Sequence, residues 1–281
     1  MMTVTILGSG AALPALGRHC SSQVVAIDGA RFLVDCGEGT QTQIRIAHQK
    51  LQAMNRIFIS HLHGDHFFGL PGLLSTMHLC GRTKPVDIYS PPGLKVALET
   101  FLEASGSHLQ FEIVYHEMDT SQSHIAYCDD KCRITAFPLI HTMPTFGYLF
   151  EELSPRHPNR YAYCSDTGYT EDILPYIKGV DVLCVESTFS SKYEALANEK
   201  LHCTATQAAT IALKAEARQL MITHFSARYK DVNELVDEAK RTFPNTIPAI
   251  EAERIDVRHF LSKLPAIEVK SPIIEDESDN K

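Results

Sequence analysis

Long apolar segments are absent from the sequence. No stretch approaches the roughly 18 consecutive apolar residues that a membrane-spanning helix needs. The first residues, MMTVTILGSG, lack the positively charged start and the apolar centre of a secretion signal. Both absences argue against a membrane protein and a secreted one, so we expect a soluble protein of the cytoplasm.

The sequence also lacks an excess of positive charge. It contains 26 Lys and Arg residues against 34 Asp and Glu residues, which gives a formal net charge of −8. Proteins that coat nucleic acid neutralise its phosphates with Lys and Arg, so this balance argues against a generally basic surface. A local basic patch, or bound metal ions, would still be able to receive a phosphate group.

Cysteine pairs that would mark a zinc-binding module are lacking as well. The eight Cys residues are scattered, and several lie inside apolar segments such as VDVLCVE. Only Cys128 and Cys132 have a ligand-like spacing, and no second Cys or His pair lies near them. We therefore expect most of these residues to be buried thiols.

The sequence does contain enough apolar material for one full core. Hydrophobic residues make up 44% of the 281 positions, and a chain of this length with mixed secondary structure usually forms one domain. We place this domain at residues 1–262. Residues 263–281 are polar and acidic, end in EDESDNK, and are interpreted as a tail.

Short apolar, β-branched segments alternate with longer amphipathic segments, which predicts β-sheets covered by helices. The expected strands are 4–7, 23–27, 31–35, 56–60, 86–89, 111–116, 133–137, 146–152, 160–164, 180–186 and 219–223. The expected helices are 40–53, 67–80, 94–105, 204–215 and 232–242. Thr204 and Gln207 have the spacing of a capping box, so the helix at 204–215 should begin there.

Four potential metal ligands follow the expected strand at 56–60. Strand geometry directs His61 and His63 to the same side, where they can share one metal ion. Asp65 and His66, in the turn that follows, can face an adjacent ion. Imidazole and carboxylate together suit zinc better than calcium or magnesium. Because these four fixed positions rarely arise by chance, we favour a metal site over a run of surface histidines.

This HxHxDH segment resembles the metallo-β-lactamase superfamily, whose further ligands can be found in order along the chain. His141 follows an expected strand as an isolated histidine, Asp166 lies in CSDTG (164–168), and His224 directly follows the strand at 219–223. The resemblance implies an α/β fold, the αββα sandwich, in which two mixed β-sheets are flanked by helices. The metal site would lie at one edge, where the loops at the strand ends converge.

The resemblance also implies two zinc ions, with manganese or iron as alternatives. One ion would be bound by His61, His63 and His141, the other by Asp65, His66 and His224, and Asp166 would bridge them. Two cations about 3.5–4 Å apart lower the pKa of a shared water and neutralise charge on a phosphoryl or carbonyl oxygen. The nucleophile would be a metal-bridged hydroxide, and Asp65 would also orient it or take its proton.

Further segments resemble one family of that superfamily, ribonuclease Z, the endonuclease that removes 3′ trailers from precursor tRNA. The segments are LGSG (7–10), VDCGEGTQ (34–41), ISHLHGDHFFGLPGLL (59–74), CSDTG (164–168), VESTF (185–189), HCTATQAA (202–209) and THFSARY (223–229). The resemblance implies that His202 protonates the leaving 3′-oxygen and that Glu186 orients it. The alternative is that His202 only caps the helix that follows. A homodimer is implied too, in which one subunit grips the tRNA and the other cuts it.

Three departures from the family pattern bear on the substrate. Val185 stands where the family has a histidine before the glutamate. The loop at residues 14–19, PALGRH, keeps the arginine of the family's PxKxRN pattern, Arg18, without its lysine and asparagine. Residues 153–159 form a short connection where the family has a long tRNA-gripping arm.

These departures leave more than one function open. We favour a zinc-dependent phosphodiesterase, an endoribonuclease that processes tRNA 3′ ends. The alternative is an arm-less hydrolase of the same fold that acts on a small phosphodiester, a sulfate ester or a lactone. A non-catalytic metal-binding regulator is less favoured, because all seven ligands are present.

Overall fold

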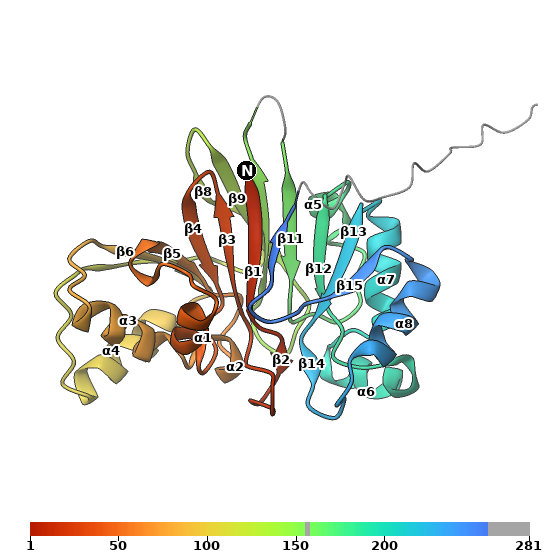
Figure 1. Ribbon diagram of the computed structural model, residues 1–281, viewed down its shortest axis with the longest axis horizontal. Coiled ribbons are helices and arrows are strands. Elements are labelled where there is room, and N and C mark those ends of the chain that lie inside the picture. Colours follow the sequence, from red (N-terminus) through yellow and green to blue (C-terminus); the bar gives the residue numbers. More distant parts are fainter. Residues whose placement is uncertain (155–157, 258–281) are drawn as a thin grey trace, which may run out of the picture.

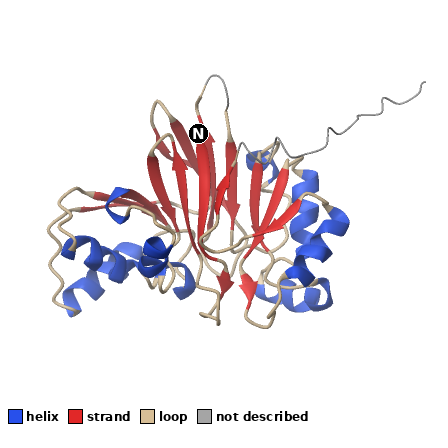
Figure 2. Cartoon of the chain, in the orientation of Figure 1, coloured by secondary structure: helices blue, strands red, loops and turns tan. Residues whose placement is uncertain are grey.

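Two seven-stranded β-sheets pack face to face between two layers of helices (Figure 1). The computed structural model describes residues 1–154 and 158–257. Helices lie on the outer side of each sheet, and the strands form the middle of the molecule (Figure 2). This arrangement confirms the αββα sandwich that the family resemblance implied.

The first sheet is built from the amino-terminal half of the chain and one late strand. Strands β16, β1, β3 and β4 pair antiparallel, and β4 to β7 pair parallel. In sheet order they are β16 (Arg254–Asp256), β1 (Met2–Gly8), β3 (Ser22–Ile27), β4 (Ala30–Val34), β5 (Met54–Phe58), β6 (Val86–Ser90) and β7 (Ile113–Glu117). Its helices are α1 (Thr40–Ile46), α2 (Gly64–Phe67), α3 (Leu70–Leu79) and α4 (Leu94–Ala104), with a 3₁₀ turn η1 (Leu51–Ala53).

The second sheet mirrors this plan with the carboxyl-terminal half. Strands β8 to β11 pair antiparallel, whereas β11, β12, β13 and β15 pair parallel. In sheet order they are β15 (Thr246–Pro248), β13 (Gln219–Thr223), β12 (Val182–Glu186), β11 (Arg160–Cys164), β10 (Phe146–Glu152), β9 (Cys132–Pro138) and β8 (His124–Cys128). Its helices are α5 (Leu174–Ile177), α6 (Glu194–Lys200), α7 (Ala205–Lys214) and α8 (Asn233–Thr242), with η2 (Ser191–Tyr193). Two short strands, β2 (Gly10–Ala11) and β14 (Phe225–Ser226), pair between the halves.

Alternating side chains along the strands produce the layers. In β4 and β5, Phe32 and Phe58 point into the space between the sheets, whereas Leu33 and Ile57 point toward the outer helices. The inner layer is rich in aromatic rings, and Phe58 meets Tyr148 of the opposite sheet edge to face with centroids 5.3 Å apart. The strands are therefore apolar on both faces, as expected for sheets covered on both sides.

Several predicted elements are confirmed and two helices are wrong in extent. The strands at 160–164 and 219–223 have the expected bounds, and Thr204 and Gln207 form both hydrogen bonds of the capping box. The helix expected at 40–53 ends at Ile46, because His48 adopts a left-handed backbone with φ of 52°, which a helix cannot continue through. The helix expected at 67–80 begins at Leu70, with Pro71 in its first turn.

One further expectation can be compared with the described residues and another cannot. Within 1–154 and 158–257, no helix is both long and apolar enough to cross a membrane. The predicted domain boundary at residue 262 and the tail at 263–281 lie outside the described residues.

Candidate metal centre

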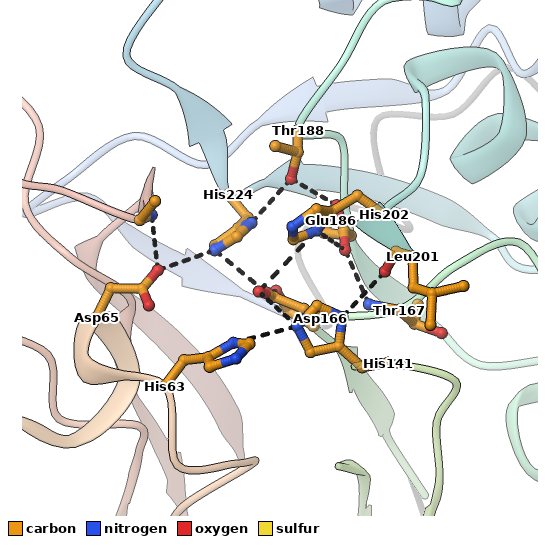
Figure 3. A network of polar contacts seen from close by, with 12 residues as sticks. His63, Asp65, His141, Asp166, Thr167, Glu186, Thr188, Leu201, His202 and His224 are labelled. Carbon is orange, nitrogen blue, oxygen red and sulfur yellow. Dashed lines mark hydrogen bonds and ion pairs between the residues drawn. The ribbon is translucent and has the colours of Figure 1, made fainter. Parts of the chain in front are cut away.

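All seven predicted ligands meet at one edge of the sandwich, just beyond the ends of strands. His61 and His63 follow β5, and the next ligands lie in α2, at its first turn. From the second sheet, His141 follows β9, Asp166 follows β11 and His224 follows β13. Carboxyl ends of parallel strands share an edge of a sheet, which explains why residues so far apart in the sequence converge. Figure 3 shows five of these side chains turned toward one another.

Three histidines form the first group of ligand atoms together with Asp166. His63 Nδ1 lies 3.0 Å from His61 Nε2 and 3.2 Å from His141 Nε2. Asp166 Oδ2 lies 3.8 Å from both of those Nε2 atoms. A single proton cannot satisfy three imidazole nitrogens that face one point, whereas one cation can.

The second group contains Asp65, His66 and His224. The Nε2 atoms of His66 and His224 are 3.4 Å apart, and Asp65 Oδ2 lies 3.6 and 3.3 Å from them. Asp166 Oδ1 is 3.4 Å from His66 Nε2 and 3.2 Å from His224 Nε2. Asp166 thus presents one carboxylate oxygen to each group, which is the arrangement of a bridging ligand.

The outward nitrogen of four of these imidazoles has an oxygen partner of its own. His66 Nδ1 donates to Asp35 Oδ2 (2.7 Å), His61 Nδ1 to Ser60 Oγ (3.0 Å), His141 Nδ1 to the Leu201 carbonyl (3.0 Å) and His224 Nδ1 to Thr188 Oγ1 (2.9 Å). These bonds place the proton on the outer nitrogen and leave the inner one free to bind a metal. The donor set therefore fits two divalent cations held by imidazole and carboxylate.

Sequence reasoning missed three of these supporting residues, Asp35, Ser60 and Thr188. Asp35 is fully buried and accepts hydrogen bonds from the Ser60 backbone and hydroxyl, from His66 and from the Tyr163 hydroxyl. The available signal was a carboxylate directly after an apolar strand, in VDCGEGTQ, a segment that otherwise supports only the family resemblance.

The six buried and two exposed cysteines agree with the expectation that most of them are buried thiols. Neither Cys128 nor Cys132 belongs to a ligand group among the described residues.

Glycine allows the ligand-bearing turn to pack closely on the loop after β4. A Cβ atom on Gly37 would lie 2.3 Å from the Asp65 carbonyl oxygen, and one on Gly69 would lie 2.1 Å from the Gly37 carbonyl oxygen. Any side chain at either position would push α2, and with it Asp65 and His66, away from the other ligands.

Beside the ligand groups, His202 is paired with a buried glutamate. His202 Nδ1 donates to Glu186 Oε1 at 2.8 Å and lies 4.0 Å from Asp166 Oδ2. Glu186 Oε1 also accepts from the Thr167 backbone, and Oε2 accepts from the Thr188 hydroxyl at 2.5 Å. Since the side chain that caps α7 is Thr204, His202 is not the cap, contrary to the alternative reading of the sequence.

Comparison with known proteins identifies the family. The Beta-lactamase superfamily domain matches residues 30–225. Ribonuclease Z of Azobacteroides pseudotrichonymphae is 43% identical and that of Bacteroides fragilis 41%, each covering 88% of this chain and 96% of the relative. The crystal structure of human tRNase Z, short form, is 32% identical with a TM-score of 0.80, covering 91% of this chain and 99% of that one.

The chain belongs to the ribonuclease Z family of the metallo-β-lactamase superfamily. It is therefore a metal-dependent hydrolase. The alignments with the two bacterial ribonucleases Z extend over 277 and 291 positions but include only 88% of the 281 residues here. These relatives thus contain residues that have no counterpart in this chain.

Burial and neighbouring charges shift the pKa values of several ligands of this ribonuclease Z site. Burial lowers the pKa of His61 well below its usual value, and it also lowers the pKa of His63 and His141, which favours the neutral, metal-binding form. Burial alone would raise the pKa of Asp166, but His224 and His66 outweigh it and hold this pKa well below the usual range. The Asp166 carboxylate is therefore ionised.

The charge of His202 is decided by Glu186. Burial lowers the pKa of His202, but the Glu186 carboxylate and its hydrogen bond outweigh that effect and raise the pKa to about 9. Without metal, His202 is therefore protonated near neutral pH and has a proton to donate.

The altered loop at residues 14–19 supports the site rather than presenting a free cation. The guanidinium of Arg18 donates to the carbonyl oxygens of Ser226 (3.2 Å) and Tyr229 (2.6 Å), in the segment that follows His224. Just before the loop, the Ala12 backbone donates to Asp65 Oδ2 at 2.7 Å. Arg18 is thus a structural contact in this chain.

The connection expected to replace the family's arm is short in the structure. Strand β10 ends at Glu152 and β11 begins at Arg160, in antiparallel register with Glu151 opposite Arg160. Residues 155–157 of this connection lie outside the described residues.

Proposed function

We propose that this protein is an endoribonuclease that cuts precursor tRNA at its 3′ end. The observation that carries the proposal is the pairing of a seven-ligand metal centre with a separate proton donor, His202, held by Glu186 beside it. Family membership supports the same reaction, since the relatives named above are ribonucleases Z.

We assign two zinc ions to the centre, with manganese or iron as alternatives. His61, His63 and His141 would hold one ion, Asp65, His66 and His224 the other, and Asp166 would contact both. When bound, the two cations lower the pKa of water toward about 7 and neutralise charge on the scissile phosphate.

The chain's own residues control the protons of the reaction. Asp65, oriented by the Ala12 backbone, accepts the proton of the attacking water. Because His202 Nδ1 is bonded to Glu186, its Nε2–H points away from that carboxylate and is the atom that donates to the leaving 3′-oxygen. The bond between phosphorus and the 3′-oxygen breaks, which leaves a 3′-hydroxyl on the tRNA and a phosphate on the trailer.

The proposal also covers the domain organisation, the assembly and the location of the protein. We propose a single hydrolase domain at residues 1–262 with an acidic tail at 263–281, a homodimer as the working assembly, and action in the cytoplasm on precursor tRNA. Both subunits would have the same short β10–β11 connection, so the second subunit would hold the substrate through other surfaces.

A second candidate is an arm-less hydrolase of a small phosphodiester. The connection of seven residues between Glu152 and Arg160 favours it, because the ligand centre and the Glu186–His202 pair do not depend on that segment.

A cleavage assay separates the two candidates. The purified protein is incubated with a precursor tRNA that carries a 3′ trailer and, separately, with a chromogenic phosphodiester, before and after metal removal and zinc addition. The proposal expects a cut at the tRNA 3′ end that is lost without metal and restored by zinc. Hydrolysis of the diester with intact precursor tRNA under every metal condition would establish the second candidate instead.

A further inference from the structure

Thr188 connects a metal ligand to the carboxylate that holds the proton donor (Figure 3). Its hydroxyl lies 2.5 Å from Glu186 Oε2 and 2.9 Å from His224 Nδ1. A hydroxyl carries one hydrogen, and an ionised carboxylate can only accept, so that hydrogen goes to Glu186. The Thr188 oxygen must then accept the Nδ1–H of His224.

Strand register brings these groups together. Strands β12 and β13 are parallel, with Glu186 opposite Thr223, and the Ser187 backbone donates to the Thr223 carbonyl at 2.8 Å. Thr188 and His224 therefore lie side by side just past the strand ends. Glu186 is completely buried and Thr188 is 5% exposed, so little water competes for these bonds.

His224 needs such a partner more than an exposed imidazole would. Its Nε2 lies 3.3 Å from Asp65 Oδ2 and 3.2 Å from Asp166 Oδ1, and either carboxylate could accept a hydrogen bond from an Nε2–H group. In the tautomer with the hydrogen on Nε2, this hydrogen would occupy the space of the cation. The bond from Nδ1 to Thr188 stabilises the other tautomer, in which Nε2 has a free lone pair.

We propose that Thr188 is a positioning residue that fixes the metal-binding tautomer of His224 and ties this ligand to the carboxylate that orients His202. The inference rests on the proposed function, because the roles of both imidazoles do. The other outward imidazole nitrogens described above use different acceptors, namely Ser60, Asp35 and the Leu201 carbonyl. Through its two hydrogen bonds, Thr188 couples His224 of the ligand cluster to Glu186, which orients the proton donor.

Two matched substitutions test the proposal through metal affinity. Thr188→Val keeps the shape of the side chain and removes the hydroxyl, whereas Thr188→Ser keeps the hydroxyl and removes a methyl group. Zinc affinity is measured on the full chain by competition with a chromogenic chelator. Thr188→Val should bind one of its two ions roughly 10- to 100-fold more weakly than wild type, and Thr188→Ser should remain close to wild type.

Two affinity results would overturn the proposal. If Thr188→Val bound both ions as tightly as wild type, the hydroxyl would have no role toward His224. If Thr188→Ser were weakened as much as Thr188→Val, the residue would act through packing of its methyl group.

A measurement on the wild-type protein covers the case in which Thr188→Val does not fold. Long-range ¹H–¹⁵N spectra of the histidine rings in the metal-free protein should show the neutral His224 ring protonated at Nδ1, and a proton at Nε2 would contradict the proposal. Neither readout uses RNA. A protein that passes both tests and leaves precursor tRNA intact would count against the proposed function alone.

Discussion

The two nitrogens of each imidazole ring have different roles in the site. The inner nitrogens of His61, His66 and His224 face the ligand groups, while their outer nitrogens donate to Ser60, Asp35 and Thr188. His202 has the same design with Glu186 as the acceptor, and this carboxylate raises the pKa of the ring to about 9.

Replacing His202 by alanine should slow the reaction according to the leaving group. An alkoxide such as the tRNA 3′-oxygen needs a proton as it departs, so turnover of precursor tRNA should fall by roughly 10²–10⁴-fold. A nitrophenolate hardly needs that proton, so hydrolysis of a nitrophenyl diester should change much less. Steady-state kinetics on both substrates measures the contrast.

Glu186→Gln provides the matched control. It keeps the size of the side chain but weakens the hydrogen bond from His202 Nδ1–H. The loss of turnover in this variant should show the same leaving-group dependence as in His202→Ala and should be smaller. Equal impairment of His202→Ala on both substrates would mean that His202 does not act as the proton donor.

Single residues differ in how far the sequence could predict them. The ligands from His61 to His66 were predictable because their types and spacing within one strand end are rare, and His141, Asp166 and His224 followed from the family order. Asp35 and Thr188 were not, since their partners lie 31 and 36 residues away in the chain. Only the pairing of strands shows that these groups meet.

At the scale of elements, the ends of parallel strands create the site. The strands β5, β11, β12 and β13 were predictable from short β-branched segments, and the polar residues just after them marked the functional edge. The end of α1 was not, because His48 interrupts a segment whose composition suits a helix. Helix ends that depend on one left-handed residue other than glycine leave little trace in composition.

The turn between β8 and β9 should make the stability of the folded protein depend on pH. Burial raises the pKa of Asp129, but hydrogen bonds from the Tyr127 hydroxyl and from the backbones of Lys131 and Cys132 outweigh it and lower the pKa to about 2. A carboxylate whose pKa is lower in the folded state stabilises that state above its unfolded pKa of about 4. This stabilisation is lost as the pH falls from about 4 toward 2.

Asp129→Asn should therefore lower the free energy of unfolding at pH 7 by about 1 kcal/mol or less, because solvent screens a turn at the surface. Denaturant unfolding at a series of pH values measures the difference from wild type, which should shrink below about pH 4. Asp130→Asn, a change at the exposed neighbouring carboxylate, is the control and should have little effect at any pH. A difference for Asp129→Asn that stays constant with pH would contradict this account.

At the scale of the whole molecule, neither sheet holds a complete site. The first sheet and its helices supply His61, His63, Asp65 and His66, and the second supplies His141, Asp166, His224 and the Glu186–His202 pair. Alternation of strands and helices predicted covered sheets, but the face-to-face packing of two sheets came from the family resemblance. Periodicity within one segment carries no information about which sheet a strand joins.

The short β10–β11 connection leads to a prediction for RNA binding. Each phosphate contact contributes about 0.9 to the slope of log affinity against log salt for a duplex. We expect the short connection to offer fewer phosphate contacts, so this chain should bind precursor tRNA weakly. Its slope should be shallower than that of the Bacteroides fragilis ribonuclease Z, whose alignment contains residues absent here. Binding measured over a salt series for both proteins gives the two slopes, and an equal or steeper slope here would mean that another basic surface grips the tRNA.

The central claim is that seven side chains bind two metal ions which the hydrolase needs. Elemental analysis of the metal-reconstituted protein, with the activity of the same sample recorded, tests it most directly. The account predicts close to two transition-metal ions per chain, and a loss of activity when they are removed. A content that stays well below one ion per chain, with full activity retained, would contradict it.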